Sequence, residues 1–80
     1  MRLDKYLKVS RLIKRRTVAA DAAGAGRVIV NGKLAKPGLQ VKEGDILEIA
    51  FGTNTVKARI TAILDTTRKE DAKEMYELLP

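Results

Sequence analysis

The hydrophobic period of this sequence changes at Val28, and this change constrains the fold more than any other feature. Upstream, apolar residues recur every three or four positions from Leu3 to Val9, which predicts a helix over that range. Downstream, the β-branched run "VIV" leads into Asn31-Gly32, a pair typical of type I′ hairpins because both central residues of that turn need a positive φ. We therefore expect an α+β fold in which two N-terminal helices pack on a small antiparallel sheet.

An alanine-rich segment predicts the second helix, from about Arg16 to Ala23, with Gly24 ending it. Three of its residues are predicted to face inward: Val18, Ala19 and Ala22. In the loop between the helices, Leu12 and Ile13 are expected to pack on the core while the basic residues face solvent. A loop anchored in this way loses little conformational entropy when it binds a partner.

The rest of the sheet is predicted from two further segments. A turn at residues 43–45 precedes a strand over about 46–51. Apolar and polar residues then alternate over 54–64, a pattern that indicates a half-buried strand.

The last part of the chain has the pattern of a short helix. Thr67 and Glu70 have capping-box spacing ahead of the segment 71–79, which predicts a helix there. We accordingly expect one domain over residues 1–64 and a C-terminal helical extension over 65–80.

Charge is distributed unevenly along the chain. Residues 1–40 contain ten Lys or Arg against two acids, a net charge of +8, whereas residues 41–80 contain six against eight, a net charge of −2. A polyanion would be attracted to the basic half and oriented by its field before contact. The N-terminal half is therefore the predicted contact surface.

Composition excludes several classes of function. The chain has no cysteine and no histidine, which removes disulfides, most zinc and copper chemistry and the usual general base near neutral pH. We expect no catalytic residue, no metal and no cofactor. No apolar run approaches the roughly 20 residues of a transmembrane helix, so a cytoplasmic protein with no membrane partner is expected.

Other interpretations of these features remain open. A basic cluster on a small domain can be no more than a solvated face. Asp4 and Asp21 lie among cations and are expected to form ion pairs, Asp4 with Arg2, Lys8 or a neighbouring loop. Tyr6 and Tyr76 fit core or interface positions better than base-stacking platforms, and three aromatic residues in all argue against a reader that stacks several bases.

Three segments together resemble a known family: "RLDKYLKVSRLIKRRTVA", "GRVIVNGKLAKPG" and "VKEGDILEI". The pattern is similar to the S4-type RNA-binding domain, the alpha-L motif, and covers about residues 1–52. The remainder resembles the stand-alone heat shock protein 15 family, and in particular its short RqcP-type ribosome-associated quality control factors. Arg15 stands where that family often has a Ser or Thr that caps the second helix, and Thr17 is expected to provide the cap instead.

The resemblance implies that the two helices and the lysines after the V-N-G turn bind phosphates of folded RNA. Carried over to this chain, the RNA-binding residues are Arg2, Lys5, Arg11, Lys14, Arg15, Arg16, Thr17, Lys33 and Lys36. The amide groups at the start of the second helix are expected to strengthen the anion site beside Arg15 and Arg16. Such a surface should recognise shape and backbone rather than base sequence.

The resemblance also implies partners and a role. These would be the rRNA of the large ribosomal subunit, peptidyl-tRNA and an RqcH-type tailing factor, with the protein acting as a monomeric clamp during untemplated alanine tailing and not as an enzyme. The alternatives are a heat-shock-type factor that recycles large subunits, a general RNA chaperone, and the RNA-binding module of an RNA-modifying enzyme.

Overall fold

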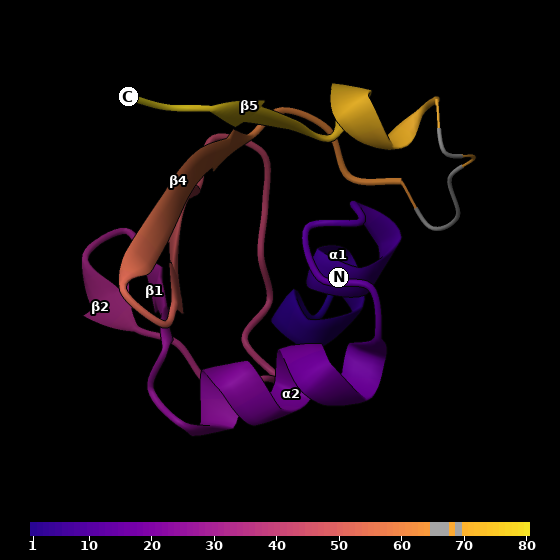
Figure 1. Ribbon diagram of the computed structural model, residues 1–80. Coiled ribbons are helices and arrows are strands. Elements are labelled where there is room, and N and C mark those ends of the chain that lie inside the picture. Colours follow the sequence, from indigo (N-terminus) through magenta and orange to yellow (C-terminus); the bar gives the residue numbers. More distant parts are fainter. Residues whose placement is uncertain (65–67, 69) are drawn as a thin grey trace.

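A computed structural model describes residues 1–64, 68 and 70–80, and shows an α+β fold of two helices and one antiparallel sheet (Figure 1). The sheet has the strand order β2-β1-β3-β4-β5. The elements are α1 (Leu3–Val9), α2 (Arg16–Gly24), β1 (Val28–Val30), β2 (Lys33–Leu34), β3 (Ile46–Phe51), β4 (Asn54–Ile60), the 3-10 helix η1 (Ala72–Glu74) and β5 (Tyr76–Leu78). Both helices lie on the same side of the sheet, which confirms the predicted fold class.

Helix α1 supplies the centre of the core. Leu3, Tyr6 and Leu7 are fully buried, as their helical spacing predicts. They belong to one apolar cluster with residues of the sheet, including Leu47 and Ile49 of β3. Ile13 is also buried there, so the loop between the helices is anchored as expected.

Helix α2 begins at Arg16 as predicted and ends at Gly24, one residue later than expected. Its buried positions are Ala19 and Ala23, which are four residues apart and share one face. The expectation that Val18 faces inward is wrong, since Val18 is 49% exposed. Small side chains on the buried face leave room for α2 to pack closely against α1.

The β1–β2 hairpin turns at Asn31-Gly32, as predicted. Asn31 has a φ of 51° and Gly32 a φ of 82°, the positive values that a type I′ turn requires. The Asn31 carboxamide continues the connection across the sheet, because its oxygen accepts a hydrogen bond from the N–H of Ile46 (2.9 Å). The hairpin is therefore fixed to the start of β3.

The predicted C-terminal helix over 71–79 is wrong. A single 3-10 turn, η1, is followed by β5, which pairs with β4 in the register Ala58↔Leu78 and Ile60↔Tyr76. Pairing satisfies the backbone groups on the outer edge of β4. Thr67 of the expected capping box lies outside the described residues.

The strand expected over 54–64 ends earlier, at Ile60. Beyond it, the N–H groups of Thr61 and Ala62 both donate to the carbonyl of Met75, at 2.9 Å and 3.3 Å. The buried hydroxyl of Tyr6 donates to the same carbonyl (2.7 Å), and burial raises the pKa of this hydroxyl. The C-terminal segment is thus tied directly to α1.

Candidate functional site

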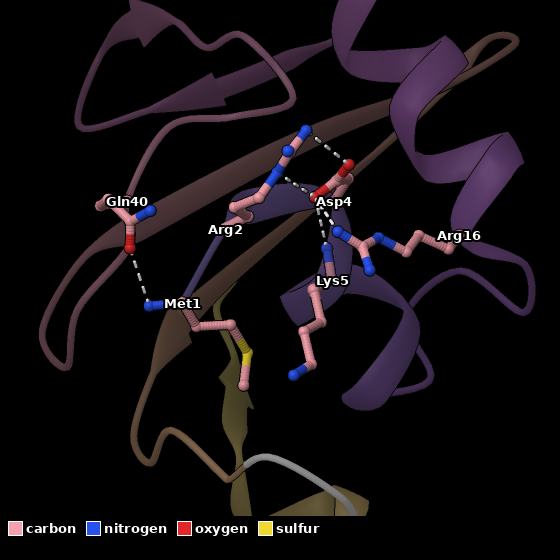
Figure 2. Close-up of polar contacts among 6 residues, drawn as sticks. All are labelled: Met1, Arg2, Asp4, Lys5, Arg16 and Gln40. Atoms are coloured by element: carbon pink, nitrogen blue, oxygen red, sulfur yellow. Dashed lines mark hydrogen bonds and ion pairs between the residues drawn. The ribbon is translucent and has the colours of Figure 1, made fainter.

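The first residues of the chain run beside the segment 37–41. The N–H of Val41 donates to the carbonyl of Met1 (2.9 Å), and the Met1 amino group donates to Oε1 of Gln40 (3.0 Å; Figure 2). Arg2 forms an antiparallel bridge with Gln40. These contacts fix the backbone of Arg2 at the start of α1.

Asp4 connects the starts of the two helices. Its carboxylate accepts two hydrogen bonds from Arg2, Nε to Oδ1 and Nη2 to Oδ2, both at 3.2 Å (Figure 2). Arg16 approaches from α2, with Nη2 3.5 Å from Oδ1, and the N–H of Lys5 donates to the same oxygen at 2.8 Å. One carboxylate therefore organises two guanidinium groups that come from different helices.

Burial differs sharply within this cluster. The Asp4 side chain is 6% exposed, whereas those of Arg2 and Arg16 are 52% and 48% exposed. A guanidinium carries five N–H donors, so each arginine has donors that Asp4 does not engage. Two cations against one anion leave a net positive charge. The cluster can therefore present pre-positioned donors to an oxyanion such as a phosphate.

The loop before α2 carries three more cations on a fixed backbone. Arg11 has a φ of 64°, a left-handed conformation that is uncommon for a residue with a Cβ. Next to it, the buried Ser10 hydroxyl donates to the carbonyl of Leu7 (3.2 Å) and accepts from the N–H of Leu12 (3.4 Å). Arg11, Lys14 and Arg15 are all exposed on this loop.

The remaining candidate residues occupy different places. Lys36 is exposed on the loop that reaches Arg2, where a Cβ on Gly38 would lie 3.9 Å from Nη2 of Arg2. Lys5 is half-buried on α1. Lys33 is exposed on the edge strand β2, in a groove beside the hairpin and not in the Asp4 cluster.

Thr17 is exposed in the first turn of α2 and does not cap it. The N-cap residue is Arg15, whose side chain makes no capping hydrogen bond. The expectation of a Thr17 cap is wrong because the helix already begins at Arg16, which places Thr17 inside the first turn.

Sequence reasoning missed part of this arrangement. It gave Arg2, Lys8 or a neighbouring loop as the partner of Asp4. The structure shows the pair with Arg2, but the sequence did not identify Asp4 as the link to Arg16. It did not single out Gln40 at all. The available signal was a lone acid among seven cations in residues 1–16.

The described part of the chain offers neither a metal-binding cluster nor a membrane-spanning helix. Within it, no three acidic side chains come together as metal ligands would. Likewise, none of the helices over residues 1–64, 68 and 70–80 is long and apolar enough to span a bilayer.

Known proteins resemble this chain in sequence and in fold. The model of the S4 domain family matches residues 1–47. An "RQC P-site tRNA stabilizing factor" of Listeria innocua is 60% identical over 79 residues, which cover 99% of this chain and 86% of that protein. The factor of the same name from Bacillus subtilis is 52% identical, with 99% and 92% covered. The trimeric structure of heat shock protein 15 from Vibrio cholerae superposes with a TM-score of 0.91 at 31% identity, covering 99% of this chain and 81% of that one.

Proposed function

Because this chain belongs to the S4 domain family and, within it, to the RQC P-site tRNA stabilizing factors, we propose that it is a non-enzymatic RNA-binding factor of ribosome-associated quality control. It binds the large ribosomal subunit that still carries peptidyl-tRNA after a stalled ribosome splits. There it contacts both rRNA and tRNA and acts, as a monomer in the cytoplasm, together with an RqcH-type factor that adds alanine to the stalled chain.

The observation that carries this proposal is the pair of guanidinium groups held by Asp4. Arg2 and Arg16 start from different helices, yet one buried carboxylate fixes both. Fixed donors lose little side-chain entropy on binding, and planar guanidinium groups suit phosphate oxygens. Two such groups on adjacent helices can engage two neighbouring phosphates, or one strand of rRNA and one of tRNA.

The mechanism follows from differential binding. A protein without catalytic groups changes the outcome of tailing only if it binds one tRNA position more tightly than its competitors. Contacts to rRNA alone would favour no tRNA position. Simultaneous contacts to rRNA and to tRNA in the P site favour that state. This is the role we assign to the basic face, by which we mean Arg2, Arg16 and the three exposed cations of the loop between the helices, Arg11, Lys14 and Arg15.

The test is binding to large subunits that carry peptidyl-tRNA, compared with empty subunits. Arg16→Ala is expected to weaken binding to the loaded subunit about tenfold, since a lost charge-assisted hydrogen bond is worth about 1.5 kcal/mol or more. Lys8→Ala, which removes an exposed charge from α1 outside the Asp4 cluster, is the matched control and should change binding less than about twofold. Equal losses would contradict the role assigned to Arg16.

A second function is favoured by a specific observation, the TM-score of 0.91 with heat shock protein 15. A recycling factor of that type would bind the same subunit without supporting tailing. Mass spectrometry of a stalled reporter chain, in cells that lack this protein, separates the two. Alanine tails restored by the wild-type chain and not by Arg16→Ala support quality control. If alanine tails are the same without the protein, with the wild-type chain and with Arg16→Ala, recycling is favoured.

A further inference from the structure

A groove runs between the β1–β2 hairpin and the segment 39–42, at one edge of the sheet. The exposed residues along it are Asn31, Lys33, Leu34, Leu39, Gln40 and Lys42. It is separate from the Asp4 cluster, and the proposed phosphate contacts use only Lys33 of these six.

Two leucines give the groove an apolar surface that faces solvent. Leu34 is 71% exposed and Leu39 is 41% exposed. Leu34 is more exposed than any other large apolar residue in the described part of the chain. Exposed apolar surface within a polar rim is a common property of binding sites.

The charges around these leucines are positive. Lys33 and Lys42 both line the groove and are exposed, one on the hairpin and the other on the segment 39–42. Asp45 also lines it, but the carboxylate is buried and both of its oxygens are engaged, Oδ1 by Nδ2 of Asn31 and Oδ2 by the N–H of Lys42, each at 3.0 Å. The groove therefore offers an apolar surface flanked by two cations.

The groove is continuous with the basic face. Its residues Leu39 and Gln40 are hydrogen-bonded to the first residues of the chain, through Leu3 N–H to the Leu39 carbonyl (2.8 Å) and through the Met1 amino group to Gln40. An RNA strand bound at Arg2 thus has a direct path into the groove. An acidic peptide would match the charges equally well, but it would not explain why the groove adjoins the residues that bind RNA.

We propose that this groove holds one unpaired nucleotide of the bound RNA, with its base on Leu34 and Leu39 and its flanking phosphates near Lys33 and Lys42. The inference rests on the proposed function, and it adds a preference for an unpaired nucleotide to the recognition of backbone shape. Aliphatic side chains cover a base face without reading its identity, so the preference should be for unpairing and not for one base.

The experiment uses two RNA hairpins that carry 2-aminopurine at one position, unpaired in the first and paired in the second by one added nucleotide. The full chain is expected to bind the first hairpin about fivefold more tightly. Leu34→Ala should abolish this preference and leave the affinity for the paired hairpin unchanged. Leu78→Ala is the matched control, because Leu78 is 63% exposed on β5 at the opposite edge of the sheet (Figure 1).

The outcomes separate this inference from the proposed function. Equal affinity of the wild-type chain for both hairpins overturns the nucleotide site while RNA binding stands. No binding to either hairpin or to the loaded subunit overturns the proposed function itself. A preference that survives Leu34→Ala, together with weaker association with the large subunit, would assign the groove to a protein partner and overturn the nucleotide site.

Discussion

Asp4 and Asp45 are two carboxylates that are almost equally buried, at 4% and 5% exposure, yet their surroundings differ. Asp4 is bound mainly by the side chains of Arg2 and Arg16, both about half exposed. Asp45 is bound by the Asn31 carboxamide and by the backbone N–H of Lys42, which belong to neighbouring turns. The donors around Asp4 still face solvent, whereas those around Asp45 are used within the fold.

Burial alone therefore does not tell what a carboxylate does in this protein. An acid that fixes mobile cations prepares a binding surface, because those cations keep donors for a second partner. An acid that receives turn donors joins two loops and stabilises the sheet. The comparison makes opposite predictions for the two residues: loss of Asp4 should mainly affect binding, and loss of Asp45 should mainly affect stability.

The largest effect is expected for Asp45→Ala. The substitution removes two hydrogen bonds to a buried charged acceptor and frees the β1–β2 turn, so we expect the free energy of unfolding to fall by about 3 kcal/mol. Chemical denaturation measures this change, with Glu43→Ala, an exposed acid in the turn 43–45 that also contains Asp45, as the control. A stable Asp45→Ala protein with weakened RNA binding would reverse the comparison.

Asp4→Asn comes next. The amide keeps the shape and an oxygen for the N–H of Lys5, but removes the charge that holds both arginines. Selectivity for the loaded large subunit over bulk RNA is expected to fall about tenfold, equivalent to 1.4 kcal/mol.

Total affinity for bulk RNA should not fall in this variant, because the net charge of the protein rises by one. Competition binding at several salt concentrations separates the two quantities. An unchanged selectivity would mean that Arg2 and Arg16 bind RNA equally well without Asp4 to position them.

Local sequence predicted most of the first 60 residues. Helical spacing identified α1, and Asn31-Gly32 identified the hairpin, because both depend on neighbours in sequence. The prediction of a helix over 71–79 was wrong because the structure of this segment depends on a strand that is distant in sequence. Its Ala, Lys, Glu and Met residues favour a helix in isolation, but the edge of β4 offers backbone partners that residues 76–78 take instead.

The candidate site likewise has a part that could be predicted from the sequence and a part that could not. The basic residues could be listed from the sequence, since charge is a property of each residue by itself. The contact between Arg16 and Asp4 could not, because it depends on the path of the loop between the helices, including the left-handed Arg11. Unlike the Asn-Gly pair at 31–32, nothing in the sequence marks Arg11 for that conformation.

Tyr6→Phe tests whether the Asp4 cluster depends on the hydrogen bond that joins α1 to the C-terminal segment. The variant loses the buried hydrogen bond to Met75, and we expect the free energy of unfolding to fall by about 1 kcal/mol. The loss is modest because the Met75 carbonyl still accepts from Thr61. RNA selectivity should be unchanged, and a reduced selectivity would show that α1 needs this support to present Arg2.

The same residue predicts a pH dependence. Burial, and to a lesser degree Tyr76, raise the pKa of Tyr6 in the folded protein above the value of about 10 in the unfolded chain. The neutral hydroxyl therefore contributes its full stability below pH 10, and that contribution is lost as pH rises beyond it. Between pH 9 and 11 the wild-type chain should lose more stability than Tyr6→Phe, and parallel curves would contradict this.

The smallest effect is expected for Glu77→Gln. Glu77 on β5 accepts a hydrogen bond from Nη1 of Arg59 on β4 at 3.4 Å, a distance close to that between Arg16 and Asp4, but here both side chains are at least half exposed. Water and salt screen such a pair, so the free energy of unfolding should change by less than about 0.5 kcal/mol and RNA selectivity not at all. A larger loss of stability at low ionic strength would mean that this pair is needed to hold β5 on the sheet. A small loss would show that the length of an arginine–carboxylate contact does not decide its effect. The Arg59–Glu77 and Arg16–Asp4 contacts have nearly the same length, but only the buried Asp4 then shapes a binding surface.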